Sequence, residues 1–133
     1  MRVVVDTPDG DAAAWLQPLL DALVEINVRW LRDHPAAPSI LSPAAGVRYE
    51  RDPVGVELWR TLPQVLRWGG GDCEDLAAAR AAELRVAGVP ARAVPRLVGR
   101  GVGVAGADLW HVVVVAGSMV EDPSAALGMR GPA

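Results

Sequence analysis

The 133-residue chain contains no lysine and no phenylalanine, and its only cysteine is Cys73. A single cysteine excludes an intrachain disulfide framework and a cysteine-rich zinc site. All 13 basic side chains are arginines, so the protein has no lysine amine to offer to an active site of its own. The sequence also has no apolar run long enough to span a membrane.

The charge and the hydrophobic content set further limits. A formal net charge of −3 at pH 7 gives no electrostatic basis for binding nucleic acid. A hydrophobic content of 51% argues against disorder, and the length fits a single domain over residues 1–133 with a core of its own. The start of the chain becomes polar too soon for a secretory signal, so we expect a cytoplasmic location.

The hydrophobic pattern predicts helices first and strands later. Apolar residues at helical spacing predict one amphipathic helix over residues 12–33, and a short helix interrupted near Pro63 is expected over residues 57–67. Between these helices, residues 34–47 are expected to form a loop that exposes His34. Strands are predicted over residues 3–5, 91–98, 109–116 and 119–121, and a turn is expected at residues 8–10, where Asp11 can cap the first helix.

Cys73 lies where a helix is expected to begin. The preceding Gly69–Gly71 run permits a tight turn, Asp72 is a suitable N-cap, and Asp75 completes a pattern similar to a capping box. The helix is then expected to continue over residues 76–88. The positive end of its dipole would lower the pKa of the Cys73 thiol and favour the thiolate.

Two neighbouring carboxyl groups complicate this expectation. Asp72 and Glu74 flank Cys73, and their negative charge would raise the pKa of the thiol. We expect Glu74 to face solvent or to pair with an arginine. An ion pair between the thiolate and an imidazolium would offset the repulsion.

His111 and Asp122 are the candidate partners of Cys73. His111 interrupts an apolar run, and Asp122 ends the next short strand, so antiparallel pairing can place the carboxylate beside one ring nitrogen. The other ring nitrogen would then face Cys73, as nucleophilic catalysis requires. Each residue alone also has an ordinary structural explanation: a small buried hydrophobe, a core histidine and a turn residue. Their order in the chain favours a Cys–His–Asp triad.

Four segments resemble the transglutaminase-like superfamily. They read GDCEDLA at 71–77, LRVAGVPAR at 84–92, WHV at 110–112 and EDP at 121–123. The resemblance implies an α+β fold with a papain-like core, in which the helix carrying the nucleophile packs on a small antiparallel sheet. It also implies that Cys73 is the nucleophile, His111 the general base and then acid, and Asp122 the residue that orients the imidazole.

The stretches 48–53, 57–60 and 122–129, together with Pro63, are similar to small transglutaminase-like proteins of tailed bacteriophages and prophages, so the location is either cytoplasmic or phage-associated. No acidic constellation that would hold calcium is visible in the sequence. We therefore expect a cysteine peptidase-like hydrolase that cleaves an amide or peptide bond through a thioester, with acyl transfer as a variant. We expect no cofactor, no metal and no membrane partner, and a peptide or protein as substrate. The alternative is a non-catalytic binding or assembly module, for example in phage morphogenesis.

A second donor to the oxyanion, beyond the Cys73 N–H, is not fixed by these motifs. Gln64, Trp59 and Trp68 are candidates for this role or for binding substrate, although each also has a structural explanation. The other tryptophans are expected in the core, with Trp15 and Trp30 on or near the buried stripe of the first helix and Trp110 in a strand. Losing one oxyanion donor typically lowers the rate by about 10²–10³, so the assignment matters.

Overall fold

The computed structural model describes residues 4, 12–53, 57–103 and 106–130. The expected strand at 3–5, the turn at 8–10 and the cap at Asp11 fall outside these residues apart from Val4, as does the end of the chain from 131 onward. The described fold is α+β, as predicted. Its main helices are α1 (Ala12–Asp33), α2 (Leu62–Trp68), α3 (Cys73–Val86) and α4 (Pro123–Ala126), and η1 (Pro43–Ala45) is a short 3₁₀ helix. Each helix in the described ranges is too short or too polar to cross a lipid bilayer.

Three strands form an antiparallel sheet in the order β3 (Arg92–Gly99), β4 (Leu109–Ala116), β5 (Met119–Glu121). The three predicted strands in this part of the chain are therefore confirmed. Gly117, with φ of 60°, makes the tight turn between β4 and β5. Within the described residues β5 pairs only with the last part of β4, from Val114 to Ala116. The first part of β4, which carries His111, is paired with β3 alone.

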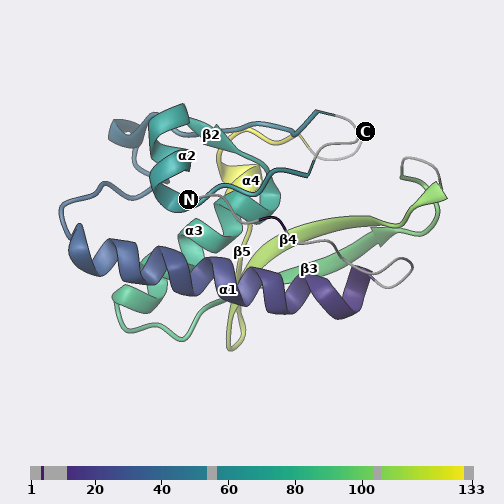
Figure 1. Ribbon diagram of the computed structural model, residues 1–133, viewed down its shortest axis with the longest axis horizontal. Helices are drawn as coiled ribbons and strands as arrows, with labels where there is room; N and C mark the ends of the chain where they lie inside the picture. The colour runs from purple at the N-terminus through teal and green to yellow at the C-terminus, as the bar shows by residue number, and fades with distance from the viewer. Residues whose placement is uncertain (1–3, 5–11, 54–56, 104–105, 131–133) are drawn as a thin grey trace.

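Helix α3 lies at the centre of the fold. It packs against α1 on one side and against β3 and β4 on the other, while α2 and α4 lie near its N-terminal end (Figure 1). Small side chains permit this close packing, because a helix surface of alanines lets neighbouring elements approach closely. Five of its alanines are completely buried: Ala77, Ala78, Ala79, Ala81 and Ala82. The predicted central helix is confirmed, although it ends at Val86 and not at residue 88 as expected.

Helix α1 begins and ends at the predicted residues and turns an apolar stripe toward the core. Leu20 and Val24 are fully buried, and Trp30 packs partly buried against the same core. Trp15 is 41% exposed, so the expectation that it joins this stripe is wrong. It lies in the first turn of α1, near the end of the helix, where little of the core reaches it. Trp110, also expected in the core, is only partly buried.

The segment between α1 and α3 differs most from the prediction. Helix α2 begins at Leu62, and Pro63 lies in its first turn, where the missing N–H is tolerated, so it does not interrupt the helix. Residues 57–61 precede α2 in irregular backbone. Two short strands, β1 (Arg48–Tyr49) and β2 (Gly70–Gly71), pair in parallel and were not predicted. A Cβ on Gly70 would lie 2.9 Å from the Arg48 carbonyl oxygen, so this close pairing requires glycine.

Candidate active site

The start of α3 is fixed by reciprocal capping. The Asp72 carboxylate accepts a hydrogen bond of 2.7 Å from the Cys73 N–H. The Asp75 carboxylate accepts from the Asp72 N–H at 3.0 Å and from the Arg60 N–H at 2.6 Å. The predicted N-cap and capping box are therefore confirmed, and Cys73 is the first residue of the helix. The Cys73 N–H was expected to face an oxyanion, but it already donates its hydrogen bond to Asp72.

The Cys73 thiol is partly buried against the core and has two polar neighbours. It donates to Glu74 Oε2 at 3.4 Å, and the Val112 backbone N–H of β4 hydrogen-bonds the sulfur. Burial raises the pKa of this thiol well above its usual value, and the carboxylates of Glu74 and Asp72 raise it further. The predicted lowering of the pKa is wrong for this arrangement, because desolvation and two carboxylates outweigh the helix dipole and the single N–H donor.

His111 and Asp122 are in contact, as the strand order suggested. His111 Nε2 lies 2.9 Å from Asp122 Oδ2, and the two side chains are 15% and 36% exposed. The second Asp122 oxygen accepts from the Ala125 N–H at 3.2 Å and caps α4. The carboxylate is thereby held by a helix end while it faces the imidazole. The catalytic role of the pair remains a prediction.

The third expected contact, between the thiol and the imidazole, is not a hydrogen bond in the described part of the chain. The thiol instead donates to Glu74, and its sulfur accepts from Val112, the residue that follows His111. Because Nε2 of His111 faces Asp122, Nδ1 is the nitrogen left to receive a proton from sulfur. The three residues thus gather around the part of β4 that pairs with β3 but not with β5, and the sulfur lies next to the backbone that carries His111.

Glu74 does not face solvent as expected. Glu74 is only 6% exposed. Within the described residues its side chain accepts a hydrogen bond from the Cys73 thiol and does not pair with an arginine. Burial, together with the negative charges of Asp75 and Asp72, raises the pKa of Glu74 from 4.5 to about 9. Asp75 is completely buried, and burial is also the main reason that its pKa rises from 3.8 to about 7. At neutral pH the carboxyl group beside the thiol is therefore protonated.

Carboxylates from separate segments gather at this end of α3. Oxygens of Asp52, Glu57 and Glu74 lie within 4.8 Å of one another, and ligand atoms of Asp72, Cys73 and Glu74 form a second such group. The fold thus brings together carboxyl groups that do not form a visible cluster in the sequence, and whether they hold a metal ion is not tested by their proximity. The loop before α2 brings Asp52 and Glu57 onto the start of α3, and this proximity could not be read from their spacing in the chain.

The remaining candidate residues lie around α2 and its preceding loop. Gln64 caps α2, since its side-chain oxygen accepts from the Thr61 N–H at 2.9 Å. Trp59 donates its indole N–H to Glu57 at 3.3 Å, and the half-exposed Trp68 ring lies under the Arg60 guanidinium at 5.0 Å. Each contact has a structural purpose, and the role of these residues in binding substrate or an oxyanion stays a prediction.

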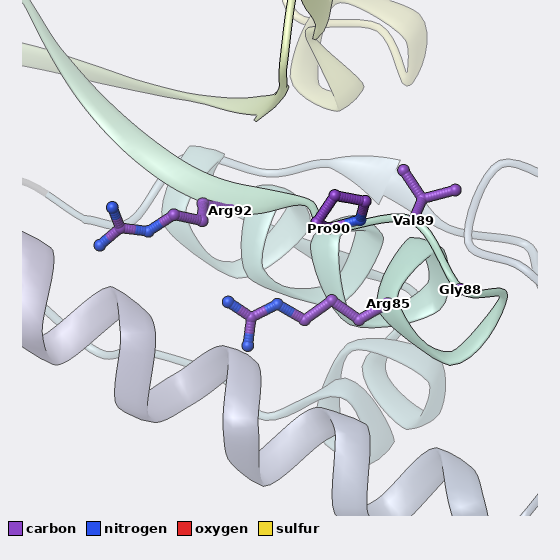
Figure 2. A pocket seen from close by; sticks show the side chains of 5 residues that line it. All are labelled: Arg85, Gly88, Val89, Pro90 and Arg92. Carbon is purple, nitrogen blue, oxygen red and sulfur yellow. The ribbon is translucent and has the colours of Figure 1, made fainter.

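A surface hollow lies away from this site. It has a volume of about 420 Å³ and is lined by Arg85, Gly88, Val89, Pro90 and Arg92 (Figure 2). These residues follow or end α3, so the length of the helix, roughly 20 Å, separates the hollow from Cys73. Both arginines already have partners, because Arg85 donates to the Ala91 carbonyl at 2.7 Å and Arg92 pairs with Asp21 of α1 at 2.8 Å. The hollow is therefore not the candidate active site.

Comparison with protein-family models, with curated proteins and with solved structures finds no match. The resemblance to the transglutaminase-like superfamily thus depends on the four sequence segments alone. The fold is established at the level of α+β with a small antiparallel sheet.

Proposed function

We propose that the protein is a cysteine-dependent hydrolase of amide or peptide bonds with a papain-like, transglutaminase-like core. Cys73 is the nucleophile, His111 the general base and acid, and Asp122 the residue that positions the imidazole. The observation that carries the proposal is the contact of 2.9 Å between His111 Nε2 and Asp122 Oδ2, on the strand whose next residue hydrogen-bonds the Cys73 sulfur. Transfer of the acyl group to an amine is a variant of the same chemistry.

The reaction begins from a neutral thiol, because burial and the nearby carboxylates raise the pKa of Cys73. Nδ1 of His111 accepts the thiol proton as sulfur forms a bond to the carbonyl carbon of the substrate. Asp122 stabilises the imidazolium through Nε2–H. The carbon–nitrogen bond then breaks as the imidazolium returns the proton to the leaving amine, and water hydrolyses the thioester.

Stabilisation of the oxyanion needs donors other than the Cys73 N–H, which is bonded to Asp72. The Val112 N–H is a candidate, because it already points at the sulfur. The protonated carboxyl group of Glu74 is a second, since an O–H beside the thiol can donate to a developing negative charge. Neither requires the helix cap to break.

One observation favours the alternative of a non-catalytic binding or assembly module. The Cys73 thiol is hydrogen-bonded to Glu74 and has a raised pKa, which stabilises the thiol against ionisation. A buried thiol held in this way can serve as a packing residue. The two functions differ in whether Cys73 ever forms a thioester.

Trapping the acyl-enzyme distinguishes these functions. The protein is incubated with libraries of activated peptide esters and glutamine-amide peptides, and intact-mass spectrometry measures acylation of Cys73. We expect acylation in the wild type and a loss of about 10²–10⁴ in its rate in His111→Gln, the usual contribution of a general base. Asp122→Asn keeps an oxygen to cap α4 and should also slow the reaction.

The chain provides a matched control for the histidine substitution. His34 is exposed, stacks on Trp30 at 4.3 Å between ring centroids and lies outside the site, so His34→Gln should leave the acylation rate unchanged. Equal rates in His111→Gln and His34→Gln, or no acylation across both libraries, would refute the hydrolase proposal and favour the binding module.

A further inference from the structure

Arg96 of β3 lies directly opposite His111 of β4. The two strands run side by side (Figure 1), and the two residues are partners in their antiparallel register, so both side chains project from the same face of the sheet. Residues that face each other in this way have Cβ atoms about 4.5–5.5 Å apart. The guanidinium, at the end of a long side chain, can therefore reach the space in front of the imidazole.

The charge of Arg96 is not used by the described part of the protein. Arg96 is exposed, and within the described residues it has no hydrogen-bond or ion-pair partner. Arg92, which lies on the same face of β3, is already paired with Asp21 at 2.8 Å. Asp122 is the carboxylate beside His111, but one of its oxygens faces the imidazole and the other caps α4. Arg96 is thus a cation that a ligand can occupy.

The side chains next to this pair are apolar. Val94, Leu109 and Val113 lie two positions from Arg96 or from His111, so the alternation of the strands places them on the same face. Leu109 is 37% exposed, which leaves part of this face open to a ligand. None of these described neighbours competes for the guanidinium. A ligand that covers them excludes water and thereby strengthens an ion pair with Arg96.

The proposed reaction determines which part of a substrate would lie here. His111 returns a proton to the leaving amine, so the amine side of the scissile bond lies beside the imidazole while the acyl group stays on the Cys73 sulfur. Because Arg96 is opposite His111, it faces the leaving group and not the acyl group. A guanidinium recognises a carboxylate through two parallel N–H···O bonds, a geometry that combines charge with direction.

We infer that Arg96 determines specificity by binding a carboxylate on the amine side of the scissile bond, and that the substrates are acidic peptides. This inference rests on the proposed hydrolase function. The carboxylate belongs either to an acidic side chain of the residue after the scissile bond or to a C-terminal carboxyl group on that residue. Both present the same planar anion to the guanidinium.

Matched peptide libraries test the inference and distinguish the two sources. They differ only in the residue on the amine side of each tested bond, which is glutamate with an amidated C-terminus, glutamine with an amidated C-terminus, or glutamine with a free C-terminal carboxylate. Mass spectrometry of the released products gives kcat/KM for the full-length protein. We expect one of the two carboxylate libraries to exceed the neutral library by about 10-fold or more, and the favoured library identifies the source.

Three variants assign this preference to Arg96. Arg96→Gln should cleave all three libraries at the rate that the wild type has with the neutral library. Arg96→Lys should keep part of the preference, because it retains the charge but not the two parallel donors. Arg100→Gln is the matched control: Arg100 is also exposed and lies beyond the end of β3, so the same change of charge there should leave the preference unchanged. Circular dichroism checks that each variant is folded.

The outcomes separate this inference from the proposed function. If activated esters acylate Cys73 but the wild type cleaves the charged and neutral libraries equally or not at all, the inference is overturned and the nucleophile stands. A preference for acidic peptides that persists in Arg96→Gln, or disappears in Arg100→Gln, also overturns it. If Cys73 is not acylated and no peptide is cleaved, the hydrolase function fails and this inference fails with it.

Discussion

Replacing Glu74 by glutamine should stabilise the protein at neutral pH, although the residue is buried beside the candidate nucleophile. Burial and two neighbouring acids raise the pKa of Glu74 from 4.5 to about 9 in the folded protein. At pH 7 the folded state therefore keeps a proton that the unfolded state releases. Glutamine has the same shape and no such proton, so the substitution removes this difference between the two states.

The size of the effect follows from proton linkage. Each pH unit between the unfolded-state and folded-state pKa lowers the free energy of unfolding by about 1.4 kcal/mol. Between the unfolded-state pKa of 4.5 and pH 7, the ionisation of Glu74 in the unfolded state lowers the free energy of unfolding of the wild type by about 3 kcal/mol. Stability is greatest below the unfolded-state pKa and falls as the pH rises toward the folded-state value. Glu74→Gln should regain up to this amount at pH 7 and little at pH 4.5.

Urea unfolding, followed by tryptophan fluorescence at several pH values between 4.5 and 9, measures the expected gain in stability at pH 7 and the small gain at pH 4.5. A chelator is present to remove divalent cations. The variant should have a flatter pH profile than the wild type. It keeps the slope contributed by Asp75, whose pKa is raised to about 7, so the difference from the wild type continues above pH 7, where the slope from Asp75 has ended. Glu25→Gln, an exposed change on α1, should follow the wild-type profile. Parallel profiles for Glu74→Gln and the wild type would refute the argument, because Glu74 would then ionise equally in both states.

Two further substitutions test how the start and the middle of α3 are held. Gly71→Ala should destabilise the fold by about 1–3 kcal/mol in urea unfolding, because a Cβ there would lie 2.8 Å from the Asp75 Cβ inside the cap; an unchanged midpoint would show that the cap can move. Arg80→Ala should cost about 1–3 kcal/mol at pH 7, because Arg80 makes two hydrogen bonds, of 2.8 and 3.2 Å, to the Glu121 carboxylate of β5. Arg80 lowers the pKa of Glu121, so this stabilisation is present at neutral pH and disappears as the pH falls through the folded-state pKa of Glu121. If Arg80→Ala destabilises the protein as much in acid as at pH 7, the explanation is wrong.

Local sequence signals accounted for the elements that position the candidate triad. The period of the apolar residues predicted α1, and the Asp72–Asp75 spacing predicted the first residue of α3, because both depend on contacts within a few residues of the chain. The strand that carries His111 and the turn that brings Asp122 back to it are also local, since they belong to one hairpin. The contact between their side chains followed from strand order alone.

The loop that covers the start of α3 was not predictable in the same way. Its contacts are long-range: the Arg60 N–H bonds Asp75, and the Asp52 N–H bonds Asp72. No periodicity marks such contacts, and the two-residue strands β1 and β2 are too short to give a pattern. The burial of Glu74 and the raised pKa values of Glu74 and Asp75 depend on this loop and were therefore missed, whereas the effect of the neighbouring carboxylates on the thiol was expected from the sequence.

The order of residues along the chain was enough to predict the cap of α3 and the contact between His111 and Asp122, because helix caps and hairpins arise from neighbours in sequence. Their protonation was decided only by the folded protein. A pKa depends on how much water and how many charges surround a group, and these come from segments that are distant in the chain. The sequence therefore indicated a thiolate, whereas the packed structure has a neutral thiol beside a protonated acid.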